Sequence, residues 1–436
     1  MSEKYNVIVV GAGPAGLMAS VRAAEKGLKV LAVEKKSNVC EQLKTTGNSF
    51  RIKNPINGEF VTVETGKDKK ARVHFHNSNF DIEYSGKLIP NYDSYSFSNS
   101  GYCMRSTRKD RPLTCIYNVE TLFEDLKERA ERAGASFMPG AYAMTAENTK
   151  TGVKLQVKKE GKASWLEADR VISADGLNSR LAETVGLNKD RPLMIRGPVC
   201  ETAFEGVEFP YPPGMAFVLG KDMLGGRGFL FVYPHAAGEN AYAVMVNTRF
   251  PATEPLRITE HFTKKSKFAP WFKHAKPIHR TAAVVTVRQP AATPYVGNVL
   301  FIGDAAAYGE TLVPGAIRCG YHAGDAVYKE LSGEKGFEEY KDYWVSNFEF
   351  INNPQKQKDY TKILRLYGGL PDDELDFLFK LAEERGTIEQ KGEMNAFNEY
   401  SGGDSLLDLF MSFPEVKGDL LNKLKEIKGA DQHFNK

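Results

Sequence analysis

The sequence predicts an α/β protein in which a parallel sheet flanked by helices is combined with an inserted antiparallel sheet and a helical C-terminal region. Three observations predict this class. A short apolar run at 5–10 leads through a glycine-rich turn into a helical pattern, which is typical of a buried parallel strand and its helix. Residues 183–295 alternate apolar runs with Pro and Gly turns, and residues 331–436 are charged and helical in pattern. The chain has 436 residues, so we expect two or three parts rather than one core.

Composition and charge exclude several classes of protein. Hydrophobic residues make up 42% of the chain and charged residues 26%, which is typical of a globular protein. The net charge is +3 with Lys and Arg spread along the chain, so we expect no nucleic acid partner. The five cysteines lack metal-ligand spacing, and we expect reduced thiols in a cytoplasmic protein without a bound metal. No apolar run reaches the length of a membrane span, so we expect at most peripheral membrane contact.

The first forty residues contain a strand, a turn, a helix and a second strand that ends in a carboxylate. The apolar run at 5–10 predicts the first strand, and the spacing of small apolar residues predicts a helix over 17–26. The run at 29–33 predicts the second strand, which Glu34 follows. The turn between the first strand and the helix contains Gly11, Gly13, Pro14, Ala15 and Gly16.

Each of these glycines has a physical reason to be where it is. Gly11 permits the tight turn, Gly13 lets the backbone approach a diphosphate, and Gly16 lets helix and strand pack closely. The helix start then offers free N–H groups and a partial positive charge to the phosphates. Glu34 stands eighteen positions after Gly16, where a carboxylate can accept the hydroxyls of a ribose; Lys35 follows it. The pattern predicts a dinucleotide site, and by itself it fits FAD and NAD equally.

Two further motifs end strands with an aspartate. The segment 170–180 predicts a strand, an Asp175-Gly176 turn and a short helix. The segment 298–324 predicts a strand that ends in Gly303-Asp304 and a helix that opens at 314–317 with small residues. An aspartate at a strand end can hold a ribityl hydroxyl. Small residues at a helix start can bring N–H groups to the pyrimidine end of a flavin, where negative charge collects on reduction.

In this order and at these separations the three motifs resemble a class of flavoproteins, the aromatic hydroxylases with the p-hydroxybenzoate hydroxylase fold, over roughly residues 1–330. The resemblance implies a Rossmann-like FAD-binding domain with an inserted antiparallel-sheet substrate domain. It also implies FAD contacts at the start of the helix at 118–134 and in a loop near residue 46. The cofactor-binding candidates are then Gly11, Gly13, Pro14, Ala15, Gly16, Glu34, Lys35, Thr46, Gly47, Asn118, Asp175, Gly176, Gly303, Asp304, Gly315, Ala316 and Ile317.

Within that class the chain is most similar to the geranylgeranyl reductase-like branch. Asp304 is followed by three alanines rather than by Ala-His. The stretch 229–234 is similar to the aromatic-x-Trp-x-Phe-Pro motif of that branch, with Phe in place of Trp and Tyr in place of Phe. The segment 364–385 is similar to its C-terminal helices. The branch carries a Lys-x-Cys-Gly loop beside the flavin, and here Thr46 stands where that loop has its cysteine.

The resemblance implies hydride transfer from flavin N5 to a carbon–carbon double bond of an apolar, isoprenoid-like substrate. Proton-donor candidates are Tyr233, His235, Tyr308 and Glu310, with Thr46 beside the flavin. No second glycine fingerprint follows the first, so the electron donor would be NAD(P)H that docks transiently, a ferredoxin-like protein or a quinol.

Three alternative functions stay open. The first is a flavin monooxygenase acting on an aromatic or small apolar substrate. The second is an electron-transfer flavoprotein passing electrons to quinone. The sequence has no cysteine after Cys319, so its C-terminal part offers no ligands for an iron–sulfur cluster. The third is a flavin-binding regulator.

The expected domain division follows from the same pattern. The predicted parts are an FAD-binding domain at 1–75, 105–182 and 290–330, a substrate domain at 76–104 and 183–289, and a helical region at 331–436.

Overall fold

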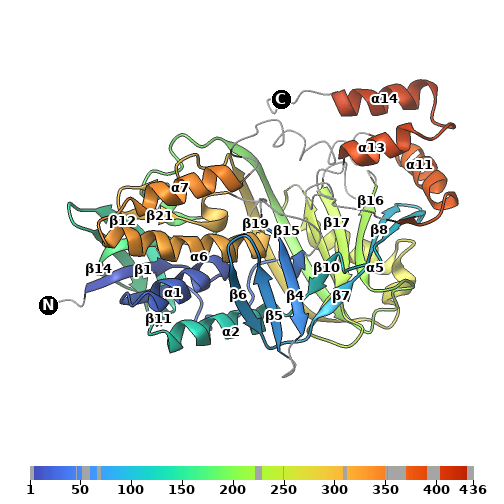
Figure 1. Ribbon diagram of the computed structural model, residues 1–436. Coiled ribbons are helices and arrows are strands. Elements are labelled where there is room, and N and C mark those ends of the chain that lie inside the picture. Colours follow the sequence, from blue (N-terminus) through green and yellow to red (C-terminus); the bar gives the residue numbers. More distant parts are fainter. Residues whose placement is uncertain are drawn as a thin grey trace.

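The parallel part of the main sheet brings the ends of the predicted motifs to one edge (Figure 1). The computed structural model describes residues 4–45, 47–51, 59–65, 70–220, 228–248, 250–307, 312–348, 351, 370–389 and 403–429. Its parallel strands run in the order β11-β2-β1-β14-β21. Their bounds are Ser136–Pro139 for β11, Val30–Glu34 for β2, Lys4–Val10 for β1, Lys162–Ser173 for β14 and Val299–Phe301 for β21.

Because parallel strands point the same way, their carboxyl ends lie at a common edge. The turn at Gly11, the carboxylate of Glu34, Asp175 and the Gly303-Asp304 segment all follow strand ends of this sheet. Strands β2 and β21 are fully buried, and β1 and β14 are buried at their carboxyl ends. Val, Ile and Leu are frequent in these buried parts, as expected for a parallel sheet covered on both faces. The sheet continues past β14 into the antiparallel strands β13 (Val153–Lys159) and β12 (Ala141–Asn148), and β20 (Tyr295–Val296) pairs with β21.

Helices α1 (Pro14–Glu25), α2 (Val119–Arg132), α6 (Leu312–Leu331) and α7 (Gly336–Asn347) surround this sheet. Helices α1 and α6 pack closely because α6 has glycines on the face that meets α1. A Cβ atom on Gly320 would lie 2.2 Å from the backbone oxygen of Ala15. A Cβ atom on Gly324 would lie 2.6 Å from Cβ of Arg22. The two helices therefore pack at close range at both Gly320 and Gly324.

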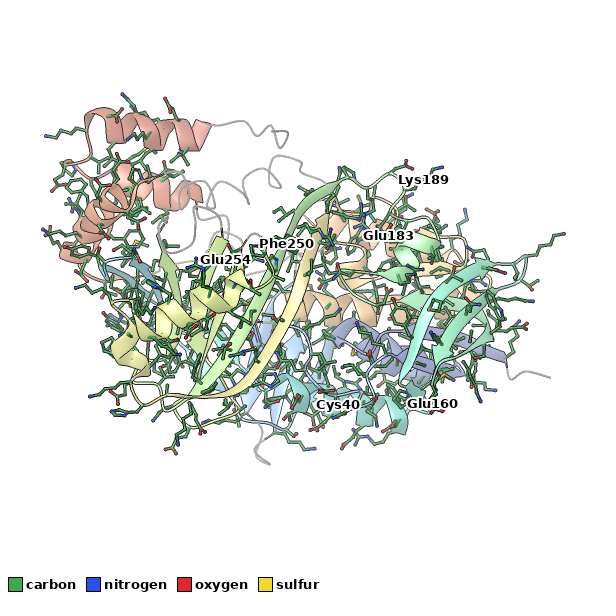
Figure 2. All side chains as sticks on the ribbon, turned by 180° about the vertical axis from the view of Figure 1, so that it is seen from behind. Cys40, Glu160, Glu183, Lys189, Phe250 and Glu254 are labelled. Carbon is green, nitrogen blue, oxygen red and sulfur yellow. The ribbon has the colours of Figure 1, made fainter. Side chains whose placement is uncertain are left out.

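The second large sheet is mostly antiparallel, with the order β19-β15-β18-β17-β16-β8-β9-β22. We call it the substrate sheet. Helix α5 (Glu254–Lys264) covers one face of it, as Figure 2 shows from behind with Glu254 labelled at the helix start. Its strands are Lys276–Arg288 (β19), Leu193–Glu205 (β15), Tyr242–Thr248 (β18), Gly228–Pro234 (β17), Gly214–Leu219 (β16), Asp93–Ser98 (β8), Cys103–Thr107 (β9) and Ile388–Glu389 (β22).

Smaller elements complete the fold. One small sheet consists of β3 (Ser49–Arg51), β10 (Thr114–Ile116) and β7 (Ile89–Asn91), and another of β4 (Val61–Thr65), β5 (Ala71–Phe75) and β6 (Phe80–Tyr84). The C-terminal helices α11 (Asp372–Glu384), α13 (Gly403–Met411) and α14 (Gly418–Gly429) share a separate apolar core beside β8 and β9.

The predicted fold class, an α/β protein with a Rossmann-like domain, an inserted antiparallel sheet and C-terminal helices, is confirmed. The exact domain division stays a prediction, and the β5–β6 hairpin crosses the boundary that we expect at residue 76. In the described part of the chain no helix is both long and apolar enough to span a membrane.

The helix contact predicts a loss of stability for Gly320→Ala. The added methyl group has no room against the backbone of α1, and overpacking of this kind costs about 1–3 kcal/mol of unfolding free energy. Urea denaturation of the holoprotein measures the change. Gly429→Ala is the matched control, because a Cβ atom there meets nothing within 4 Å. Equal stability of the two variants would show that the helices tolerate a wider separation.

Candidate functional site

A cavity of about 670 Å³ lies between the carboxyl edge of the parallel strands and the substrate sheet. This volume is within the range of roughly 300–1,000 Å³ that small-molecule and cofactor sites have. All three sequence motifs reach it. The predicted cofactor-binding residues that line it are Gly11, Gly13, Pro14, Ala15, Glu34, Lys35, Gly47, Asp175, Gly176, Asp304 and Ala316.

The glycine turn forms a backbone cradle at one end of the cavity. Gly11 has φ +95°, and a Cβ atom on it would lie 2.4 Å from the backbone oxygen of Ala174. A Cβ atom on Gly16 would lie 1.8 Å from the backbone oxygen of Gly11, so neither position accepts a side chain. Helix α1 begins at Pro14 after the N-cap Gly13, which has no side chain to occupy the helix start. Free N–H groups at that start therefore face space that an anionic group can enter.

The carboxylate of Glu34 is held in a fixed orientation at the end of β2. Its Oε2 accepts a hydrogen bond from the N–H of Ala12 at 2.6 Å, and its Oε1 accepts one from the N–H of Lys36 at 2.9 Å. The side chain is only 4% exposed yet lines the cavity. Each carboxylate oxygen has a second lone pair, so Glu34 can still accept hydroxyl donors from the cavity.

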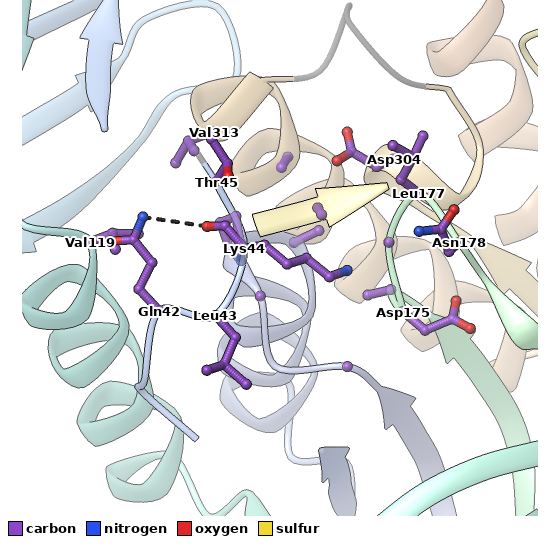
Figure 3. A pocket seen from close by; sticks show the side chains of 18 of the residues that line it. Gln42, Leu43, Lys44, Thr45, Val119, Asp175, Leu177, Asn178, Asp304 and Val313 are labelled. Carbon is purple, nitrogen blue, oxygen red and sulfur yellow. Dashed lines mark hydrogen bonds between the residues drawn. The ribbon is translucent and has the colours of Figure 1, made fainter. Parts of the chain in front are cut away.

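Lys44 crosses the cavity toward the other strand ends. Figure 3 shows its amine directed toward Asp175 and Asp304 from the loop that also carries Gln42 and Thr45. Burial lowers the pKa of the Lys44 ammonium, and the charge of nearby Lys35 adds to this shift. The two aspartates oppose it. Lys44 therefore adds a cation to the lining of the cavity, close to the two strand-end aspartates.

Arg191 fixes the segment that carries Asp304. Its guanidinium donates hydrogen bonds to the carbonyl oxygens of Ala305 at 3.0 Å and Ala306 at 2.7 Å. The N–H of Ala291 donates a further bond to the oxygen of Ala306 at 2.9 Å. These bonds hold the residues between β21 and α6 in place. No local sequence pattern pointed to this role of Arg191, because the carbonyl groups of Ala305 and Ala306 lie more than a hundred residues away.

Other predicted cofactor-binding residues lie beside the cavity rather than in its lining. The side chain of Asn118 caps α2 by accepting hydrogen bonds from the N–H groups of Glu120 and Thr121. Gly16, Gly303, Gly315 and Ile317 are part of the packed turn and helix starts behind the lining. Thr46, Tyr308 and Glu310 lie outside the described residues.

The substrate sheet forms an apolar wall of the same cavity. Along β17 the side chains alternate, so that Phe229 and Phe231 face the cavity while Leu230 and Val232 pack toward α5. Asn247 is the one polar residue that the described strands of this sheet add to the lining. The apolar contributors are Val199, Met215, Phe229, Phe231, Met245, Ala282, Ala283, Val284 and Val285.

The two described proton-donor candidates are buried next to this wall. Tyr233 is fully buried, and its hydroxyl donates a hydrogen bond to the carboxylate of Glu201. Burial, with a smaller effect from nearby His279, lowers the pKa of His235 to about 4, so His235 is neutral at pH 7. Neither residue is part of the cavity lining. Their catalytic roles stay predictions.

Cys40 is buried against α2 and also lies away from the lining (Figure 2). Burial, with a contribution from Glu124 of α2, raises the pKa of its thiol. A thiol of this kind is a poor nucleophile at neutral pH.

The comparison with protein families decides what this cavity holds. Residues 4–308 match the model of the FAD binding domain family. The chain belongs to this family. The match spans the first two motifs and the Gly303-Asp304 part of the third, so FAD is the cofactor, as predicted, and the protein is an FAD-dependent oxidoreductase. The backbone cradle, the hydrogen-bonded carboxylate of Glu34 and the volume of the cavity all fit a bound dinucleotide such as FAD.

Relatives and solved structures resemble the flavoprotein along most of its length. A digeranylgeranylglycerophospholipid reductase of Methanocaldococcus jannaschii is 28% identical over 393 residues, which cover 87% of this chain and 90% of that protein. A geranylgeranyl bacteriochlorophyll reductase-like protein of Thermoplasma acidophilum has a TM-score of 0.70 at 18% identity, covering 98% of this chain and 99% of its own. The p-nitrophenol 4-monooxygenase of Pseudomonas putida has a TM-score of 0.64 at 16% identity, covering 94% and 98%. The predicted resemblance to the geranylgeranyl reductase-like branch is confirmed.

The site geometry predicts that Glu34→Ala weakens FAD binding. Charge-assisted hydrogen bonds are worth about 1.5–3 kcal/mol, so we expect the dissociation constant to rise by roughly 10- to 100-fold. Glu34→Gln keeps one acceptor oxygen, so this variant should lose less FAD affinity than Glu34→Ala. Titration of the apoprotein with FAD, followed by flavin fluorescence, measures the affinity.

Glu147→Ala is the control for this titration, because Glu147 is an exposed carboxylate on β12 outside the cavity. An unchanged affinity in both Glu34 variants would show that Glu34 does not contact the cofactor.

Proposed function

We propose that this flavoprotein reduces carbon–carbon double bonds in the isoprenoid chains of a lipid. The observation that carries the proposal is the apolar wall of the FAD cavity. Phe229, Phe231 and Met245 present large apolar side chains from neighbouring strands, and Asn247 is the polar exception in the described part of that wall. A wall of this composition gains free energy by burying a hydrocarbon chain and offers little to a polar substrate.

The names of the relatives support the same substrate class. Two archaeal relatives, at 28% and 26% identity, are digeranylgeranylglycerophospholipid reductases. Such a substrate combines long unsaturated hydrocarbon chains with a polar headgroup. We infer that the hydrocarbon enters the apolar half of the cavity while the headgroup stays outside or at the membrane surface.

We propose that the strand ends hold FAD along its length. Glu34 would accept the hydroxyls of the adenosine ribose, and the start of α1 would hold the diphosphate with Lys44 as an additional cation. Asp304 would lie near the ribityl chain, and Val313 and Ala316 at the start of α6 would lie near the flavin ring.

When bound and reduced by the electron donor, the flavin would supply a hydride from N5 to a carbon–carbon double bond. The work of this chain is to place that bond and to exclude water. Aromatic and thioether side chains can adapt to a flexible chain, since Met has three rotatable bonds and no polar group that needs a partner. Phe231 and Met215 also separate the cavity from the buried Tyr233, so water does not reach the reacting carbons from that side.

The electron donor would dock transiently, because no second glycine fingerprint for a nicotinamide cofactor is present in the sequence. NAD(P)H, a ferredoxin-like protein and a quinol all satisfy this requirement.

The proposal predicts that the reduced holoprotein is oxidised by a digeranylgeranylglycerophospholipid without oxygen. Dithionite-reduced protein is mixed anaerobically with the lipid in detergent micelles, and the return of the flavin absorbance is followed. Mass spectrometry of the lipid should show the gain of one hydrogen molecule per reduced double bond. The saturated lipid is the control and should leave the flavin reduced. Oxidation by air alone, with oxygen incorporated into an aromatic compound, would instead support a monooxygenase.

A further inference from the structure

A buried carboxyl group, Glu201, lies on the cavity side of the substrate sheet but outside the cavity lining. Its side chain is fully buried, and the hydroxyl of Tyr233 donates a hydrogen bond to its Oε2. Glu201 is on β15 and Tyr233 on β17, with β18 between them. The two side chains meet across β18 because its residue beside Tyr233 is Ala243, whose methyl group leaves the space free.

Two hydroxyl groups, of Thr45 and Thr281, lie between this carboxyl group and the cavity. Thr281 on β19 is directly opposite Glu201 in the antiparallel register, so the two side chains are on the same face with Cβ atoms about 4.5–5.5 Å apart. Thr281 is itself buried, at 3% exposure. Its Oγ1 is 3.1 Å from Oγ1 of Thr45, and Thr45 lines the cavity beside Lys44 (Figure 3). The order from the cavity inward is Thr45, Thr281, Glu201 and Tyr233.

Reduction of a double bond needs a proton as well as a hydride. The apolar wall has no acid among its described residues, because Asn247 is its one polar member and an amide does not release a proton. The carboxylates and ammonium groups of the lining come from the strand ends and from the loop at 41–45, on the nucleotide side. Thr45 is a residue of the lining whose hydroxyl reaches the substrate sheet, at Thr281.

We propose that Glu201 stores the proton for the reduction and delivers it through the hydroxyl groups of Thr281 and Thr45. This inference rests on the proposed function. One alkene carbon receives the hydride, and the electron pair of the double bond takes the proton of the Thr45 hydroxyl at the neighbouring carbon. Thr45 then takes the proton of Thr281, and Thr281 takes the proton of Glu201. The alkene is reduced and the flavin is oxidised. Glu201 remains as a carboxylate that accepts the Tyr233 hydroxyl until, after product release, water in the cavity returns a proton through Thr45 and Thr281.

The resting state of Glu201 can be measured without any substrate. Infrared spectroscopy of the oxidised holoenzyme should show the carbonyl band of a protonated carboxylic acid, shifted in heavy water and lost in Glu201→Gln. Glu59→Gln is the matched control and should keep the band. Glu59 is also a buried carboxylate, but it is paired with Arg318 at 3.1 Å. No such band in the wild type, or a band that persists in Glu201→Gln, would overturn the proposal.

The route is tested by single-turnover oxidation of the reduced flavin with a digeranylgeranylglycerophospholipid. Glu201→Gln should slow this step by roughly 100- to 10,000-fold, the usual contribution of a general acid. Thr281→Val should slow it while keeping the infrared band, and Thr281→Ser should restore the rate. All three variants should bind FAD with the affinity of the wild type, which shows that the fold is intact.

The outcomes separate the two proposals. A wild-type rate in Glu201→Gln overturns the role of the carboxyl group, and a wild-type rate in Thr281→Val overturns the route. If the wild type itself does not react with the lipid, the proposed function is contradicted, whereas the infrared result still decides whether Glu201 holds a proton.

Discussion

The close contact between α1 and α6 determines where the FAD motifs lie relative to one another. Gly320 and Gly324 let the two helices approach until only backbone separates them, since a Cβ atom at Gly320 would lie 2.2 Å from the oxygen of Ala15. Both helices begin at the carboxyl edge of the parallel strands. Their starts therefore share one wall of the cavity, although they are far apart in sequence. Any wider spacing would move the residues after Asp304 away from the glycine turn.

The cavity has two chemically different halves because two kinds of structure form it. Helix starts have backbone N–H groups without partners inside the helix, and the strand ends carry carboxylate side chains. Both kinds of group can bind the phosphates and hydroxyls of a dinucleotide. The middle of an antiparallel sheet has all backbone groups paired and presents only side chains, here mostly Phe, Met, Val and Ala. In the proposed function, an apolar substrate would meet the flavin at a boundary between polar and apolar surfaces. The proposed reduction depends on this division more than on any single residue.

Local patterns predicted the nucleotide half well. The turn at Gly11, the carboxylate of Glu34 and the aspartates at 175 and 304 follow strand ends within a few residues, so short-range sequence carries the information. Asn118 shows the limit of the family resemblance, because its side chain caps a helix, a role that the capping preference of Asn also explains.

The substrate half could be predicted only in part. The alternation of side chains along β17 predicts which face of the sheet Tyr233 is on. It does not predict that Tyr233 is buried beneath the cavity lining, behind Phe231 and Met215. The relation of Glu201 to Thr281 depends on the register of two strands about eighty residues apart, and no local pattern fixes that register. Lys44 and Arg191 were missed as site residues for the same reason, since their partners come from distant segments.

A crystal structure of the FAD-bound protein tests the central claim, that one cavity joins the FAD motifs to an apolar substrate wall. We expect the adenosine ribose at Glu34, the diphosphate at the start of α1, and the flavin ring between Val313 and the side chains of Phe229 and Met245. A cofactor bound outside this cavity, or a ring turned away from the substrate sheet, would contradict it.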